Sequence, residues 1–112
     1  MSMLYKVKAK INKLKMIEFY NALTDGSIAA LEPEGPEIVN AMQKALKTED
    51  DVLEWYEVCH CATPLEHERD TVYDKYLYDF EVALVYEIKD DIKGQSFWDC
   101  LENWHFDDTY TF

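Results

Sequence analysis

The stretch that decides the fold is 52–77, which reads VLEWYEVCHCATPLEHERDTVYDKYL. Its first part, through Cys61, is rich in β-branched and aromatic side chains, which favour a strand. Apolar side chains fall on both faces, a pattern typical of a strand covered on both sides. Thr63, Pro64 and Glu66 then form a helix start, because Thr63 and Glu66 can cap backbone N–H groups and Pro64 lacks one. The stretch therefore predicts a buried strand, a tight corner and a helix.

The helix after the corner carries two stripes of side chains. The residues of its apolar stripe recur at helical spacing and are expected to face the core: Leu65, Val72, Tyr73, Tyr76 and Leu77. His67, Asp70 and Asp74 fall on a different stripe, which is exposed or faces a cleft. Glu66 and Arg69 have the i,i+3 spacing of a helical ion pair.

The chain before this stretch supplies a strand and a helix. Residues 3–11 alternate apolar side chains with lysines, which predicts a half-buried strand. Residues 13–23 follow helical spacing after Asn12, a potential N-cap, and we expect the helix to end at Gly26, which can adopt positive φ. Residues 27–31 are ambiguous, and we interpret them as a short strand.

The remaining segments complete the element order. Pro36 opens a second helix after the break at 33–36. Residues 48–51 are expected to form an acidic loop, and 78–88 to form a strand with one wholly apolar face. Ser96 begins a capping-box pattern and thus a short helix, which leaves 105–112 as an aromatic, acidic tail.

The resulting order, β-α-(β)-α-β-α-β-α, predicts an α+β fold. We expect a ferredoxin-like sheet of three or four strands with helices on one face and an extra helix inserted before the central strand. The 112 residues are expected to form one domain. Because the strands are apolar on both sides, a homodimer that pairs the uncovered sheet faces is the economical solution.

Composition restricts the partners. The chain has 23 acidic residues against 11 basic ones and a net charge of −12, so phosphate backbones and anionic membrane surfaces would be repelled. No apolar run approaches the roughly 20 residues of a membrane-spanning helix. The N-terminus lacks a signal-peptide pattern. With three cysteines, an odd number, we expect a cytoplasmic protein with reduced thiols.

One sequence resemblance bears on the fold. The run WYEVCHCATPLEHER at 55–69, together with TDGSI at 24–28, resembles a group of small uncharacterised proteins that are associated with ferredoxin-like dimeric α+β barrels. The resemblance spans residue 3 to about residue 101. It implies a fold and a dimer but no activity and no catalytic residues, because that superfamily includes monooxygenases, haem-handling enzymes, isomerases and ligand-sensing modules.

Histidines near the corner are candidates for acid–base chemistry. His60 or His67 could act as a general base, since histidine titrates near physiological pH and a carboxylate could orient the ring. Arg69 could then hold an acidic group of the substrate. The alternative is a solvated helix face. A small cofactor-independent enzyme is thus one hypothesis.

Two cysteines at the end of the strand allow further alternatives. Cys59 and Cys61 share a face and could bind zinc with His67. No fourth ligand is evident, however, so the sequence favours small apolar side chains that fill a strand end, with no metal and no cofactor. Thiol catalysis is disfavoured as well, because the acidic surroundings raise a thiol pKa.

The second hypothesis is a homodimeric small-molecule-binding or structural module. Its pocket would lie near the end of the 52–61 strand and His60, where aromatic side chains could line a cavity. The residues expected to line it are Tyr56, Cys59, Cys61 and Tyr73.

Overall fold

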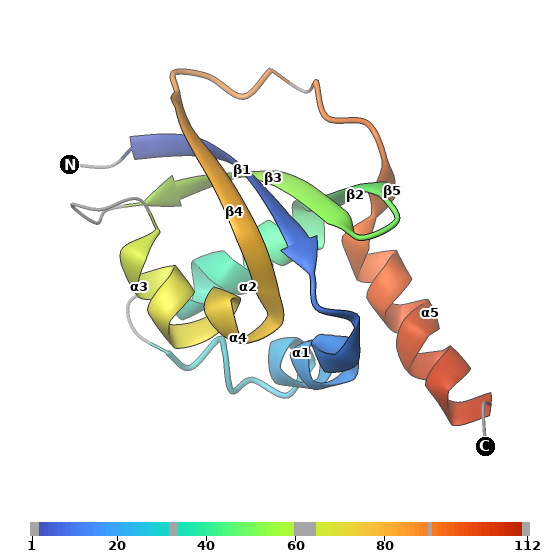
Figure 1. The fold of residues 1–112 in the computed structure, drawn as a ribbon. Helices are drawn as coiled ribbons and strands as arrows, with labels where there is room; N and C mark the ends of the chain where they lie inside the picture. Colours follow the sequence, from blue (N-terminus) through green and yellow to red (C-terminus); the bar gives the residue numbers. More distant parts are fainter. Residues whose placement is uncertain (1–2, 32–33, 60–64, 90, 111–112) are drawn as a thin grey trace.

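The computed structural model describes the backbone of residues 3–31, 34–59, 65–89 and 91–110, with the side chains of all these residues except Cys59, His67 and 104–110. The elements in chain order are β1 (Met3–Ile11), a 3-10 turn (Lys13–Lys15), α1 (Met16–Thr24), α2 (Gly35–Lys44), β2 (Leu46–Glu49), β3 (Val52–Cys59), α3 (Glu66–Glu68), a π-helical turn (Arg69–Tyr73), α4 (Asp74–Tyr76), β4 (Leu77–Val85), β5 (Gln95–Ser96) and α5 (Phe97–Tyr110). The strands form one antiparallel sheet in the order β4-β1-β3-β2-β5 (Figure 1). The predicted α+β class is confirmed.

The strand count and order differ from the prediction. The described residues form five strands instead of three or four, because β2 occupies part of the expected acidic loop and β5 precedes the last helix. Both strands are too short for hydrophobic periodicity to reveal them. The last helix extends to Tyr110, so most of the expected tail is helical.

The predicted strand at 27–31 is wrong. The Asp25 carboxylate accepts hydrogen bonds from the Ser27 N–H at 2.8 Å and the Ser27 hydroxyl at 2.6 Å. The Ala30 N–H then donates to the Gly26 carbonyl at 3.0 Å. Consecutive turns therefore replace a strand. Gly26 has φ +89° just after α1, as predicted for the end of that helix.

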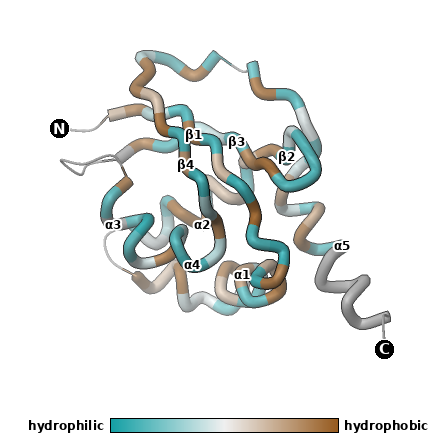
Figure 2. Tube along the Cα trace, viewed as in Figure 1, coloured by the Kyte–Doolittle hydropathy of each residue, from teal (hydrophilic) through white to brown (hydrophobic). Residues whose placement is uncertain are grey.

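Alternation along β1 separates the two faces of the sheet and can be followed in Figure 2. Val7, Ala9 and Ile11 are buried against the helices, whereas the lysines between them lie on the opposite face. Trp55 on β3 faces the same core as Val7. The Phe19 ring from α1 stacks on Tyr76 with centroids 4.5 Å apart, which joins the helical layer to the end of the corner helix.

The corner helix has the predicted inward face but a different start. Leu65, Val72 and Tyr73 are fully or almost fully buried. The helix begins at Glu66 after Leu65, whose φ is 56°, and Leu65 makes no side-chain cap. The predicted caps, Thr63 and Pro64, lie outside the described residues.

The connection between β4 and β5 crosses the sheet, because these strands lie at opposite edges (Figure 1). It passes over the lysine-bearing face, where Asp91 accepts hydrogen bonds from the Tyr56 hydroxyl at 2.5 Å and Lys6 Nζ at 3.0 Å. The predicted 78–88 strand therefore ends early, at Val85, and its apolar face is not wholly covered: Leu84 is 46% exposed and Tyr86 is 93% exposed.

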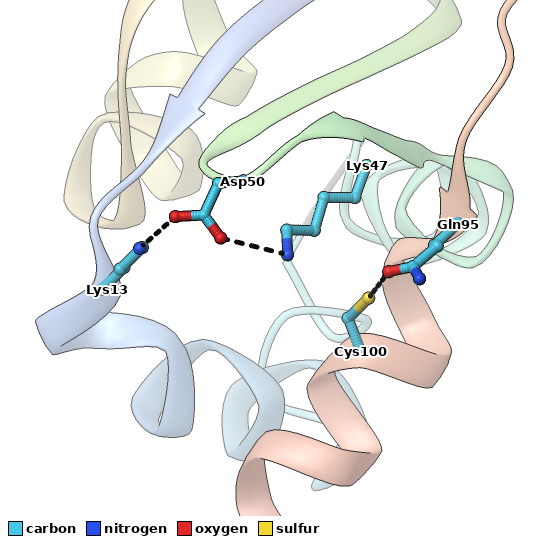
Figure 3. A network of polar contacts seen from close by, with 5 residues as sticks. All are labelled: Lys13, Lys47, Asp50, Gln95 and Cys100. Carbon is cyan, nitrogen blue, oxygen red and sulfur yellow. Dashed lines mark hydrogen bonds and ion pairs between the residues drawn. The ribbon is translucent and has the colours of Figure 1, made fainter.

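Three polar contacts lie at the other end of the sheet (Figure 3). Asp50, in the turn between β2 and β3, pairs with Lys13 at 2.8 Å and with Lys47 at 3.9 Å. Cys100 Sγ on α5 lies 3.7 Å from Gln95 Oε1. The first contact ties this turn to the segment between β1 and α1. Because the Lys13 and Asp50 side chains are 51% and 83% exposed, this ion pair orients the turn more than it stabilises the fold.

Candidate functional site

A buried carboxyl group lies at the centre of the candidate site. Glu57 on β3 is 4% exposed and faces the core with Trp55 and Leu53. Its Oε1 accepts hydrogen bonds from the Tyr73 hydroxyl at 2.6 Å and from Trp55 Nε1 at 2.7 Å. The Trp55 and Tyr73 rings also pack with centroids 5.4 Å apart, which fixes both donors. Strand β3 and the corner helix thus hold one carboxyl oxygen from two sides.

Burial changes the protonation of this group. It raises the pKa of Glu57 from 4.5 to about 8, although the hydrogen bonds from Tyr73 and Trp55 oppose the shift. The nearby carboxylates of Glu68 and Glu37 raise the pKa of Glu57 further. Burial, reinforced by Glu57, also raises the pKa of Tyr73 well above its ordinary value. At neutral pH Glu57 therefore carries a proton.

The second oxygen of Glu57, Oε2, is buried and lacks a hydrogen-bond partner among the described residues. Because Oε1 already accepts two hydrogen bonds, the carboxyl proton belongs on Oε2, where it can be donated. A neutral carboxylic acid in this state can bind a polar group or transfer a proton.

A groove lies beside this carboxyl group, between α2 and the final residues of β3. Its volume is about 370 Å³. We call it the α2–β3 groove and define it by its lining residues: Leu4, Glu37, Asn40, Ala41, Lys44, Tyr56, Glu57, Val58 and Ile88. Strand β2 pairs with β3 only as far as Glu54, so the later residues of β3 have no β2 partner beside the groove.

Sequence reasoning missed Glu57, although a signal was present. Residues 53 and 55 face the core, and alternation places 57 on the same face. A glutamate in the buried phase of an apolar strand is unusual, because burying a carboxylate is costly unless it is protonated or paired. The histidines and cysteines of the corner are the more conspicuous signal in the sequence, and they obscure this position.

The side chains of two predicted pocket residues, Tyr56 and Tyr73, are described, and both lie near Glu57. Tyr56 lines the groove, and its hydroxyl binds Asp91. Tyr73 does not line the groove but lies behind it, fully buried against Glu57. The structure thus brings both tyrosines to the same carboxyl-bearing strand end.

Arg69 has a different environment from the one expected. Its Nε lies 2.9 Å from Asp74 Oδ1, so the expected partner, Glu66, is replaced by a residue five positions along. The guanidinium lies over the Phe80 ring, 4.5 Å from its centroid. Arg69 is not among the groove residues. Its side chain is 42% exposed and holds the corner helix against β4.

The other predicted site residues cannot be placed against the groove. His60 and Cys61 lie outside the described residues, and only the backbone of Cys59 and His67 is described. The catalytic roles of the two histidines and the pocket roles of the two cysteines therefore stay predictions. The zinc alternative falls on the same side chains.

Replacing Tyr73 by phenylalanine tests the carboxyl arrangement. Tyr73→Phe removes one of two donors to a buried oxygen, and we expect it to lower the free energy of unfolding by about 1–3 kcal/mol. Because that hydrogen bond lowers the pKa of Glu57, the pKa is expected to rise further in the variant. Denaturant unfolding measures the first effect, and NMR titration of the Glu57 carboxyl carbon the second. An unchanged pKa would contradict the arrangement.

No helix in the described part of the chain is both long and apolar enough to span a membrane. Comparison of the chain with protein-family models, curated proteins and solved structures finds no match.

Proposed function

We propose that this chain is a small-molecule-binding module whose ligand occupies the α2–β3 groove. The observation that carries the proposal is a groove of about 370 Å³ beside a protonated carboxyl group whose second oxygen has no partner among the described residues. Ligand sites typically measure about 300–1,000 Å³ and combine apolar walls with a few polar groups. Leu4, Val58 and Ile88 supply the apolar wall, and Asn40 and Lys44 supply polar groups.

A pair of variants on α2 tests this function. Ala41→Leu adds bulk inside the groove, whereas Gln43→Leu adds the same side chain at an exposed position outside the lining. We expect fragments from a library of small amides, acids and aromatic compounds to shift the backbone NMR signals of Tyr56 and Val58. Ala41→Leu is expected to weaken that binding at least about tenfold, which corresponds to a loss of about 1.4 kcal/mol in binding free energy. Gln43→Leu is expected to leave the binding unchanged. Fragments that bind elsewhere, or equally well to both variants, would refute the proposal.

A second candidate is a cofactor-independent acid–base enzyme of the dimeric α+β barrel type. In addition to the expected His60 or His67, Glu57 itself supports this candidate, because a pKa of about 8 suits a general acid near neutral pH. The pairing of Arg69 with Asp74 favours the binding module instead, since an arginine that anchors substrate would face the cavity. Fragments recovered unchanged after incubation support binding, whereas turnover that is lost in Glu57→Gln supports the enzyme.

The ferredoxin-like arrangement and the homodimer also belong to this proposal. The order β4-β1-β3-β2 of the first four strands, with helices between β1 and β2 and between β3 and β4, supports the first. The homodimer is supported by exposed apolar side chains at one end of the sheet. Met3, Tyr86 and Ile88 are 36%, 93% and 64% exposed. Sedimentation equilibrium should give twice the monomer mass at high concentration, and a monomer would refute the pairing. A cytoplasmic location fits the free thiol of Cys100.

A further inference from the structure

We propose that the α2–β3 groove binds an extended peptide segment, which adds to the free edge of β3 as a new strand beside α2. This inference rests on the proposed function, because it assigns a ligand class to the same groove. The juxtaposition that carries it is an unpaired strand edge facing a helix across a groove of about 370 Å³.

Strand register shows which backbone groups face the groove. The Ile11 N–H donates to the Asp51 carbonyl at 2.7 Å, and this pair continues the register in which Lys10 lies opposite Val52. Hydrogen-bonded pairs alternate along an antiparallel ladder, so the odd-numbered residues of β3 bond to β1. The N–H and C=O groups of Tyr56 and Val58 therefore point away from β1.

These four backbone groups have no strand partner among the described residues. The pairing of β2 with β3 ends at Glu54, and no other described strand follows on that side. Polar backbone groups at an open edge form a template for another strand, and proteins use such edges to bind peptides. The free edge covers Trp55–Cys59, about 17 Å at the usual rise per residue, which matches a peptide of roughly five residues.

The side chains around the edge specify the peptide further. Successive residues of an added strand point to opposite faces. On the outer face they meet Leu4, Val58 and Ile88 and should be apolar, whereas on the inner face they approach Ala41. Among the charged residues of the groove, Glu37 balances Lys44, because Glu57 is protonated. The whole chain, however, carries a net charge of −12. A basic peptide is therefore favoured over an acidic one.

The other free edge of the sheet provides a matched control. Leu84 on β4 lies opposite Tyr5. Because odd-numbered residues of β1 bond to β3, this pair is not hydrogen bonded, and the Leu84 N–H points away from the sheet. Val58 and Leu84 are 40% and 46% exposed, so proline at either position removes one outward N–H from a similar environment. Leu84, however, is not part of the groove.

The experiment is a selection from a random heptapeptide library displayed on phage, with the full-length chain as the target. Recovered sequences are synthesised, and their Kd is measured for the wild type, Val58→Pro and Leu84→Pro. We expect basic, alternating sequences that lose at least about tenfold in affinity with Val58→Pro and change less than about twofold with Leu84→Pro, because one edge hydrogen bond is removed in the first variant alone. Methylation of each peptide N–H in turn should weaken binding at alternate positions.

Several outcomes would overturn the inference. Recovery of no peptide, equal binding to both proline variants, or N-methylation effects without alternation would each exclude strand addition. If Val58→Pro does not fold, judged by circular dichroism, the N-methylation series on wild type and slowed hydrogen exchange of the Tyr56 and Val58 amides decide the question. Fragments that bind the groove when peptides do not would overturn this inference and leave the proposed function standing. Failure of both would overturn both.

Discussion

Glu57→Gln is expected to abolish most of the loss of stability that the wild-type protein shows as the pH rises from about 5 to about 9. Burial raises the pKa of Glu57 from 4.5 in the unfolded chain to about 8 in the folded one. Between these values the unfolded chain releases a proton that the folded chain keeps, so the free energy of unfolding falls with rising pH. The contribution is fully present below pH 4.5 and is lost as the pH passes through about 8. The total effect is on the order of 4 kcal/mol.

Glutamine is the appropriate replacement because it reproduces the neutral acid. Its carbonyl oxygen can still accept from Tyr73 and Trp55, and it does not ionise. We therefore expect the variant to resemble wild type near pH 5 and to be more stable at pH 9. Urea unfolding at unit pH intervals measures this difference.

Glu54→Gln is the control for this experiment. Glu54 lies on the same strand but on the opposite, half-exposed face. Its replacement should leave the pH dependence of the wild type intact. Parallel pH profiles for wild type and Glu57→Gln would contradict a protonated, buried Glu57.

Gly35→Ala is expected to destabilise the fold by about 3 kcal/mol or more. Gly35 is the first residue of α2, and a Cβ there would lie 2.1 Å from the Ile28 carbonyl oxygen and 3.1 Å from that of Ala29. Both obstructing atoms belong to the backbone of the 27–31 turns, so no side chain can rotate to make room. Either α2 or the turns must move, and α2 forms one wall of the groove.

Gly26→Ala separates this clash from ordinary backbone strain. Gly26 has φ +89°, but no atom of the described residues lies within 4 Å of the point that a Cβ would occupy. Alanine there should therefore cost about 1–2 kcal/mol from conformation alone. The measurement is chemical denaturation of both variants. A smaller loss for Gly35→Ala than for Gly26→Ala would show that α2 does not approach the 28–29 backbone closely.

The sequence predicts the longer elements of the fold well. The alternation of 3–11, the helical spacing of 13–23 and the capping pattern at Ser96 each correspond to an observed strand or helix. The Asp99 N–H donates to Ser96 Oγ at 3.3 Å, as the capping pattern requires. These patterns succeed because each extends over at least two turns or several alternations, or contains a specific cap.

Short segments and tertiary relationships are less accessible to sequence reasoning. Strand β5 has two residues, and its pairing with Lys47 depends on a connection that crosses the sheet. No local pattern encodes such a crossing. The turns at 27–31 depend on the Asp25 side chain, whose hydrogen bonds outweigh the β propensity of Ile28.

The sequence predicts a candidate site in the correct region but not with the correct chemistry. Tyr56 and Tyr73 are expected at a pocket near the end of the strand, and both lie close to Glu57. Predicting Glu57 as a site residue would require knowing that its face of β3 is the buried one. The alternation of apolar residues would then have to be continued through a charged residue. Arg69 could not be assigned from spacing, because the π-helical turn changes which residues are neighbours.

The crossing connection has a consequence for the order of assembly. Strand β1 lies between β3 and β4, whereas β5 joins the sheet through residues 95 and 96 alone, beside β2. A segment that lies over three strands needs those strands already in place before it can settle on them. The connection after β4, together with β5, should thus join the structure last, and the contacts of Asp91 with Lys6 and Tyr56 would fix it in place.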